Sequence, residues 1–97
     1  MDENKLWVLL KRIPKRKVTT YKILAERLDT SPRVVGNVLH KNKDPDNVPC
    51  YKVVRSDGSV GGYNLGKKEK IFRLKKDGIT IKSDKISNLP DYLFYFQ

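Results

Sequence analysis

The feature of this 97-residue sequence that most restricts its fold is a pair of short helical segments joined by a tight turn. The first segment begins at a threonine cap, carries one apolar stripe and runs to about Leu28. Ser31 followed by Pro32 then places a serine at the N-cap and a proline in the first helical position, and the second helix runs to about His40. Two short helices with this spacing, the second one basic, predict a helix-turn-helix.

The segments before and after this pair predict a helix and a small hairpin. Residues 4–13 place apolar side chains at helical spacing, and Pro14 ends that helix. Residues 48–54 are β-branched and aromatic, residues 56–59 form a turn, and residues 60–63 are a second short extended piece. This order predicts a hairpin, or wing, behind the helix-turn-helix.

The C-terminal third predicts one more helix and an aromatic tail. Residues 67–76 form a basic helix that stops at Gly78 and whose apolar side is Ile71, Phe72 and Leu74. Extended pieces follow at 79–81 and 85–86, and the tail "LPDYLFYF" is expected to complete the core rather than to form a docking surface. We therefore predict one α/β domain over residues 1–97: a small, mostly helical winged helix-turn-helix with a short β-hairpin.

The charge balance favours a polyanionic partner. The chain has 21 Lys and Arg against 11 Asp and Glu, a formal net charge of +10. Such a charge favours nucleic acid through counterion release over the alternative of a solvated basic face. The only apolar piece near the N-terminus, residues 6–10, is too short for a signal peptide or a membrane span. We expect a cytoplasmic protein with no membrane partner.

The single cysteine, Cys50, lies in the apolar run "VPCYKVV". One cysteine cannot form an internal disulfide or supply the paired thiolates of a structural zinc site. Packing, an intermolecular bond and a reactive thiol remain open, and a lone sulfur in a valine-rich stretch would by itself favour packing. His40 has no second histidine beside it, so we expect no metal and place it at a helix C-terminus or against a phosphate.

The order of motifs along the chain carries a resemblance to a known family. The segments "IPKRKVTTYKILAERL", "SPRVVGNVLHKN" and "NVPCYKVVRSDGSVGGYNLGKKEKIFRLKKDGI" occur in this order. Together they resemble the DNA-binding, active-site domain of 6-O-alkylguanine-DNA alkyltransferases and of their short relatives, the alkyltransferase-like proteins. The resemblance is close over residues 5–79, and residues 79–97 are similar to the C-terminal extension of the short members. It implies a monomer without cofactor that flips an alkylated guanine out of duplex DNA and takes the alkyl group irreversibly onto its own cysteine.

The resemblance assigns the catalytic positions. Cys50 falls on the acceptor cysteine, because the family's "PCHRV" reads "PCYKV" here. Tyr51 replaces the histidine and Asp77 replaces the glutamate that together relay the cysteine proton. A tyrosine stays protonated at neutral pH and is a poor general base, but its hydroxyl can donate to a thiolate. Asn42 matches the asparagine hinge that bonds backbone groups across the turn, and it is also a plausible helix C-cap.

The same resemblance assigns the residues that handle the DNA. Arg33 matches the finger that fills the space left by the flipped base, with a simple phosphate contact as the alternative. Tyr21 matches the tyrosine that presses on the target phosphate, with a core aromatic as the alternative. Tyr63 would stack on the guanine, Asn64 replaces a serine near the alkylated oxygen, and the Val53 carbonyl would accept from the guanine edge.

Three functions remain open from the sequence. The first is a stoichiometric alkyltransferase, which Cys50 favours. The second is a lesion-binding alkyltransferase-like protein that flags alkylated guanine for another repair pathway; that group replaces the acceptor cysteine, so Cys50 counts against it and Tyr51 for it. The third is an unrelated winged-helix regulator, which would require a dimer and a sequence-specific site.

Overall fold

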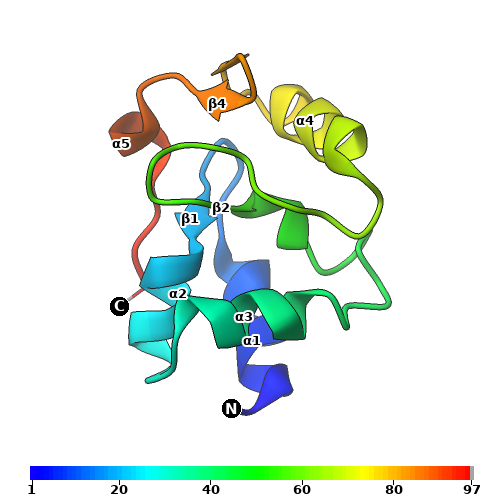
Figure 1. Cartoon of the computed structure of the whole chain (residues 1–97), viewed down its shortest axis with the longest axis vertical. Helices are drawn as coiled ribbons and strands as arrows, with labels where there is room; N and C mark the ends of the chain where they lie inside the picture. The colour runs from blue at the N-terminus through cyan, green and yellow to red at the C-terminus, as the bar shows by residue number, and fades with distance from the viewer. Residues whose placement is uncertain (97) are drawn as a thin grey trace.

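The computed structural model describes residues 1–96. The elements form two groups at opposite ends of the molecule, with the two-stranded β1–β2 sheet between them (Figure 1). Helices α1, α2 and α3 lie at one end, and α4 lies with the β3–β4 hairpin at the other. No helix within residues 1–96 has the length and apolar character needed to span a bilayer. The helices are α1 (Glu3–Arg12), α2 (Tyr21–Arg27), α3 (Pro32–Leu39), the 3-10 helix η1 (Cys50–Lys52), α4 (Lys67–Lys76) and α5 (Leu89–Tyr92), and the strands are β1 (Thr19–Thr20), β2 (Val53–Val54), β3 (Ile81–Lys82) and β4 (Lys85–Ile86).

The helix-turn-helix prediction is confirmed at its caps. Thr20 Oγ1 accepts a hydrogen bond from the Ile23 amide at 3.0 Å at the start of α2. Ser31 Oγ accepts from the Val34 amide at 3.2 Å at the start of α3, with proline in the first turn. These bonds satisfy amides that have no partner inside the helix, so short segments of seven and eight residues begin at defined positions.

The predicted hairpin over residues 48–63 is wrong, although its turn is present. Residues Cys50–Lys52 form η1, and β2 pairs in parallel with β1 in the register Thr19↔Val53. The Arg55 amide donates to the Ser59 carbonyl at 2.9 Å across the turn. Residues 60–63 do not return along β2; the Val60 amide donates to the Asp84 carbonyl instead. Both residues of β2 are fully buried, which suits a strand covered on both faces better than an exposed wing.

The short hairpin of the fold is β3–β4, where the sequence predicted two extended pieces. Its strands pair in the register Ile81↔Ile86, and the two turn residues Ser83 and Asp84 have φ of 50° and 62°. Positive φ at both central positions is the geometry of a type I′ turn, whose twist matches that of the flanking strands.

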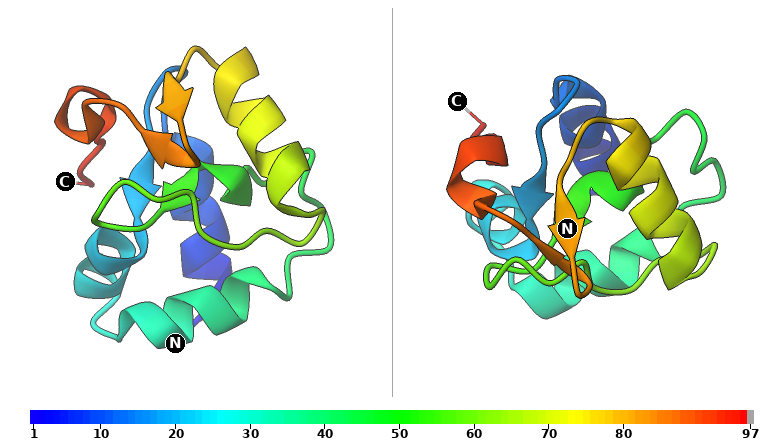
Figure 2. Two further views of the ribbon diagram at one scale, coloured as in Figure 1. Left: turned by 45° about the horizontal axis from the view of Figure 1, so that its top comes forward. Right: turned by 90° about the horizontal axis from the view of Figure 1, so that it is seen from above.

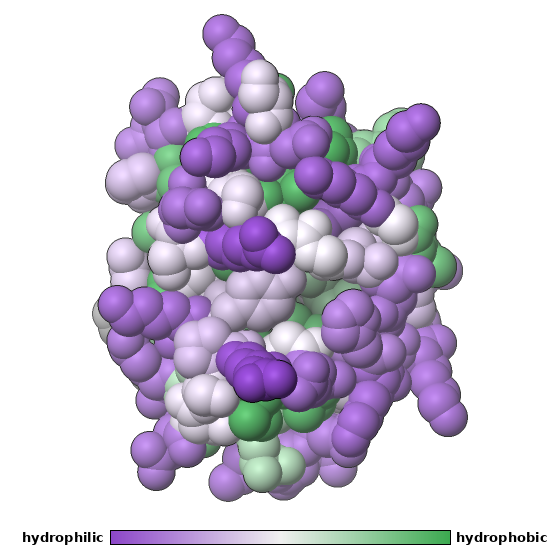
Figure 3. Space-filling view, in the orientation of Figure 1, coloured by the Kyte–Doolittle hydropathy of each residue, from purple (hydrophilic) through white to green (hydrophobic). Residues whose placement is uncertain are grey.

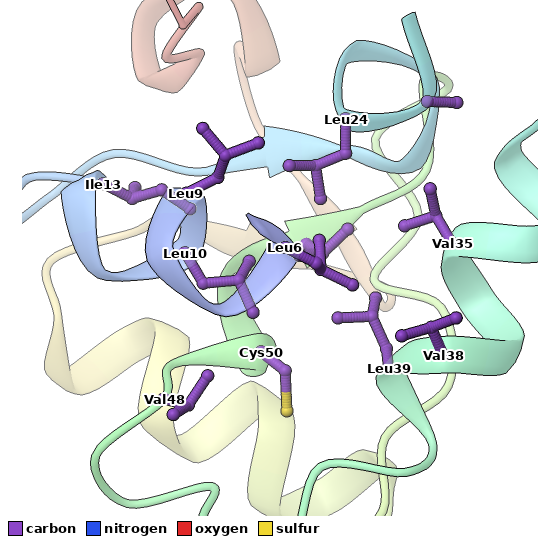
Figure 4. Packing of buried hydrophobic residues seen from close by; sticks show 12 residues of the cluster. Leu6, Leu9, Leu10, Ile13, Leu24, Val35, Val38, Leu39, Val48 and Cys50 are labelled. Atoms are coloured by element: carbon purple, nitrogen blue, oxygen red, sulfur yellow. The ribbon is translucent and has the colours of Figure 1, made fainter. Parts of the chain in front are cut away.

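Two groups of buried side chains form the core. The first joins α1, α2, α3 and η1, and Figure 4 shows Cys50 at its edge with the sulfur pointing away from Leu6 and Leu10. The second joins β2, α4 and the β3–β4 hairpin. The first group consists of Leu6, Leu9, Leu10, Ile13, Leu24, Ala25, Val35, Val38, Leu39, Val48, Cys50 and Val53, and the second of Val18, Val54, Val60, Leu74, Ile79 and Ile86.

The aromatic tail packs on both groups, as predicted. The Val18 amide donates to the Tyr92 carbonyl and the Phe94 amide donates to the Val18 carbonyl, each at 2.8 Å. Phe94 and Phe96 pack against the first group with their rings edge to face at 5.1 Å. The tail returns past β1 toward α2, as Figure 2 shows from two sides.

The apolar side predicted for α4 is only partly correct. Leu74 is buried, but Phe72 is 60% exposed, and the other fully buried side chain of the helix is Lys70. Asp77 at the C-cap is also buried, and Gly78 follows it with φ of 92°, the left-handed conformation typical of the residue after a helix. The face of α4 that meets the rest of the molecule therefore carries charged groups.

Candidate active site

A cavity of about 580 Å³ opens between α2, α3 and the loop of residues 55–64. In the orientation of Figure 1, hydrophilic side chains cover most of the surface around a paler central area (Figure 3). Five of the residues assigned from the sequence line this cavity: Tyr21, Arg33, Cys50, Tyr63 and Asn64. Residues that are 43 positions apart in the chain, Tyr21 and Asn64, thus meet at one site.

Cys50 begins η1 and presents its thiol to the cavity from the edge of the core. Its side chain is only 5% exposed. Burial raises the pKa of the Cys50 thiol, while a hydrogen bond from Asn42 and the charges of Lys70 and Arg73 oppose that rise. The thiol is free, because the chain has no second cysteine. The site therefore holds a nucleophile that depends on its neighbours for ionisation.

Asn42 does not line the main cavity, but it joins three segments of the chain near it. Its side-chain amide donates to the Val48 carbonyl at 3.0 Å, and its Oδ1 accepts from the Asp44 amide at 3.0 Å. Its backbone carbonyl accepts from Asn64 Nδ2 at 3.3 Å. Asn42 is 8% exposed, so these bonds fix the turn that leads from α3 to Cys50.

Tyr21, the first residue of α2, packs directly beneath the loop that carries Tyr63. A Cβ at Gly61 would lie 2.9 Å from the Tyr21 hydroxyl, and Gly61 has φ of 76°. A side chain at position 61 would meet both a steric and a conformational penalty. Burial raises the pKa of Tyr21, and the charge of Arg55 opposes that rise. Glycine therefore lets the loop close onto the tyrosine.

The mouth of the cavity is basic. Lys22, Arg33 and Arg55 line it, and Arg33 lies in the first turn of α3. His40 lies at the end of the same helix, where its Nδ1 is 3.0 Å from Asn64 Oδ1. The sequence placed His40 at a helix C-terminus, which is confirmed, and its contact is with a residue of the cavity. A ring of cations around a concave site suits a phosphate-bearing ligand.

Tyr51 and Asp77, assigned to the proton relay, line a second cavity of about 490 Å³ instead. Burial, together with the charge of Asp77, raises the pKa of Tyr51 to about 12. Asp77 Oδ2 pairs with Lys52 Nζ at 2.8 Å, and both side chains are buried. The structure thus places the phenol and the carboxylate in one cavity, apart from the five residues around the thiol.

Val53 does not line the main cavity, and its carbonyl already has a partner. Lys70 Nζ donates to it at 2.7 Å and also donates to the Gly62 carbonyl at 3.0 Å. A carbonyl oxygen has two lone pairs, so Val53 can accept a second donor. The sequence interpretation missed Lys70, because it took Ile71, Phe72 and Leu74 as the buried side of this basic helix. The available signal was its spacing of four residues from the buried Leu74, which puts both on one face.

Among residues 1–96, no group of three or more His, Cys, Asp or Glu side chains is placed to hold a metal ion. The polar side chains that line the main cavity carry a thiol, the Ser56 hydroxyl, two phenols, an amide, an imidazole and three cationic groups. The reactive group that this set offers is the Cys50 thiol.

A family model described as the 6-O-methylguanine DNA methyltransferase, DNA binding domain, matches residues 2–79. The chain belongs to this family. The resemblance noted in the sequence is therefore confirmed, and an unrelated winged-helix regulator is excluded. The family match spans α1 through α4 and includes every residue that lines the main cavity.

Curated relatives of this chain are longer than the segment that matches it. A "Bifunctional methyltransferase/endonuclease" from Picrophilus torridus is 50% identical over 91 residues, covering 92% of this chain and 30% of the relative. A "Methylated-DNA--protein-cysteine methyltransferase" from Pyrobaculum aerophilum is 45% identical over 78 residues, covering 80% of this chain and 51% of the relative. The chain spans about half or less of the length of these curated relatives of the alkyltransferase family.

Solved structures of the family have the same fold. The O6-methylguanine-DNA methyltransferase of Pyrococcus kodakaraensis superimposes with a TM-score of 0.74 at 42% identity, covering 79% of this chain and 46% of that one. S. pombe Atl1, in complex with damaged DNA containing O6-carboxymethylguanine, superimposes with a TM-score of 0.81 at 26% identity. That match covers 95% of this chain and 93% of Atl1. The predicted fold class, a small α/β winged helix-turn-helix domain, is confirmed.

Proposed function

We propose that this protein binds duplex DNA, takes an O-alkylated guanine into the main cavity and transfers the alkyl group to Cys50. The Cys50 sulfur would form a bond to the alkyl carbon while the bond from that carbon to the guanine oxygen breaks. The oxygen keeps the electron pair, and the proton lost by the thiol balances the charge on the restored guanine. The protein ends as a thioether and acts once.

Each residue of the cavity has a role in this proposal that follows from its chemistry. Arg33, at the mouth, would enter the DNA and pair with the base left behind, because a guanidinium is planar and donates in a fork. Tyr21 would press on the target phosphate. Tyr63 would stack on the flipped guanine and Asn64 would lie beside its alkylated oxygen, while the second lone pair of the Val53 carbonyl would accept from the guanine edge.

Tyr51 would not relay the thiol proton in this reaction. A phenol with a pKa of about 12 keeps its proton at neutral pH, so it cannot accept one from the thiol. Asp77 is already paired with Lys52, so it would remain a charged group of the second cavity and would not receive the thiol proton directly. Asn42 would fix the turn before Cys50 and donate to its sulfur.

The observation that supports this proposal best is the placement of Cys50 on the wall of the same cavity as Tyr21, Arg33, Tyr63 and Asn64. A buried structural cysteine would have no reason to share a basic cavity with four residues suited to a nucleotide. The test is the amount of 6-O-methylguanine left in a duplex after incubation with increasing protein. We expect one lesion repaired per protein molecule, with none repaired by Cys50→Ser; lesions that persist at excess wild-type protein would contradict alkyl transfer.

A second candidate, a lesion-binding sensor, has its own support. The structure of Atl1, on which this chain superimposes with a TM-score of 0.81, is a complex with damaged DNA containing O6-carboxymethylguanine. The fusion implied by the name "Bifunctional methyltransferase/endonuclease" also pairs this kind of domain with strand cleavage. Under this alternative, the protein binds the lesion tightly, leaves it in place and hands it to another repair activity.

A further inference from the structure

Lys70 is a fully buried lysine on α4. It is 0% exposed, and within residues 1–96 no carboxylate oxygen lies within ion-pairing distance of its Nζ. Its Nζ donates to the carbonyls of Val53 and Gly62 and lies 5.8 Å from the centre of the Tyr21 ring. Burying an ammonium group away from water is unfavourable unless hydrogen bonds or a nearby negative charge compensate for the lost hydration.

The two carbonyls that Lys70 binds belong to two different segments, of which Gly62 lines the main cavity and Val53 lies behind it in the core. Val53 directly follows η1, which carries Cys50, while Gly62 precedes Tyr63 in the loop that closes over Tyr21. One side chain thus ties the cysteine segment to the loop at distances of 2.7 and 3.0 Å. These bonds fix how far the loop stands from the thiol.

The charge of Lys70 also acts on the thiol. It is the foremost of the charged groups that oppose the effect of burial on the pKa of Cys50, ahead of Arg73. In return, an ionised Cys50 favours the charged form of Lys70, while burial and the nearby Arg55 disfavour it and bring the Lys70 pKa to about 7. Lys70 and Cys50 therefore stabilise each other's charged forms.

We propose that Lys70 is a positioning residue of this site, which ties the Val53 and Gly62 segments together beside the base pocket and stabilises the Cys50 thiolate. The part that concerns the base pocket rests on the proposed function. The part that concerns the thiolate depends only on the protein.

The test compares Lys70→Met with Lys75→Met by the rate at which iodoacetamide alkylates Cys50 between pH 6 and pH 10. Methionine keeps the length of the side chain and removes the charge and the donors, whereas Lys75 lies exposed on the same helix and gives the same change in net charge. We expect Lys70→Met to raise the apparent pKa of Cys50 and to slow alkylation at neutral pH by roughly tenfold, the effect of one pKa unit. Lys75→Met should match wild type. A folded Lys70→Met with the wild-type profile would overturn the proposal.

A second measurement applies if Lys70→Met does not fold. The side-chain amine of Lys70 can be titrated by NMR in Cys50→Asp, whose carboxylate places a negative charge at this position, and in Cys50→Ser, which cannot ionise. Because coupling between two groups is reciprocal, the Lys70 pKa should be lower in Cys50→Ser. Equal values in the two proteins would overturn the proposal.

Neither measurement uses DNA, so the two proposals can fail separately. A protein that leaves 6-O-methylguanine unrepaired yet shows a lower Cys50 pKa in the presence of Lys70 would lose the proposed alkyl transfer and keep the role of Lys70. If the wild type repairs the lesion but the Cys50 alkylation profile is identical in wild type and Lys70→Met, the proposed alkyl transfer stands and the role of Lys70 is lost.

Discussion

Lys52 Nζ lies 2.8 Å from Asp77 Oδ2, and the two side chains are 6% and 8% exposed. The same ammonium donates to the Pro14 carbonyl at 2.9 Å, so one buried lysine joins η1, the end of α4 and the chain after α1. A buried pair of this kind is costly to break, because removing one partner leaves the other charge uncompensated away from water.

We expect Lys52→Met to lower the free energy of unfolding by about 3 kcal/mol, since it leaves Asp77 buried without its partner. The matched control is Lys67→Met, because Lys67 pairs with Asp84 at 2.9 Å while both side chains are more than half exposed. That variant should change stability by less than about 1 kcal/mol. Urea denaturation followed by circular dichroism measures both, and equal losses in the two variants would contradict the structural importance of the buried pair.

Gly61→Ala should impair the site while Gly62→Ala should not. A Cβ at position 61 would lie 2.9 Å from the Tyr21 hydroxyl on a backbone with positive φ, whereas nothing lies within 4 Å of a Cβ at position 62. We expect Gly61→Ala to cost about 1–2 kcal/mol of stability and to slow alkyl transfer by displacing the loop from Tyr21. Single-turnover transfer rates and thermal unfolding of both variants test this. Transfer at the wild-type rate by Gly61→Ala would mean that the loop is not held against Tyr21 during the reaction.

Tyr51→His should speed transfer about tenfold at neutral pH and leave lesion affinity unchanged. An imidazole with a reference pKa near 6.5 can accept a proton, whereas the pKa of the present phenol is about 12. The comparison is between single-turnover rates and equilibrium binding to the same duplex. Loss of transfer in this variant would show that the phenol has a specific role as a hydrogen-bond donor and would contradict this prediction.

Arg33→Ala should weaken binding to DNA that contains the lesion by about 1–3 kcal/mol, because it removes the group that would hold the flipped state open. The reaction of Cys50 with a free alkylated base should be unaffected. Arg27→Ala is the control, since Arg27 ends α2 and lines a different groove. If the two variants lose the same affinity, Arg33 contributes only its charge.

Local signals along the chain were sufficient to predict the helix-turn-helix. Thr20, Ser31 and Pro32 determine where α2 and α3 begin through bonds within three residues, so the pattern is legible without the rest of the molecule. The five cavity residues were found through the order of motifs rather than through their spacing. Their meeting depends on how α2, α3 and the loop pack together, which no local rule describes.

The parts that could not be predicted depend on contacts between distant segments. The pairing of Thr19 with Val53 is parallel and joins segments 34 residues apart, so the β-branched run at 48–54 looked like one arm of a hairpin. The burial of Lys70 and Lys52 could not be predicted, because it depends on carbonyls and a carboxylate that only the fold brings to them. On α4 the prediction failed in both directions, because Phe72 is exposed where it was expected to be buried and Lys70 is buried.

The central claim is that Cys50 accepts an alkyl group from guanine, and one measurement tests it most directly: the intact mass of the protein after incubation with duplex DNA that carries 6-O-methylguanine, followed by peptide mapping. We predict that the wild type gains the mass of one methyl group, located on Cys50. Cys50→Ser should bind the same duplex and gain nothing, and a duplex with unmodified guanine should leave both proteins unchanged. A wild-type protein that binds the lesion but keeps its original mass after prolonged incubation would contradict the claim and favour the lesion-binding sensor.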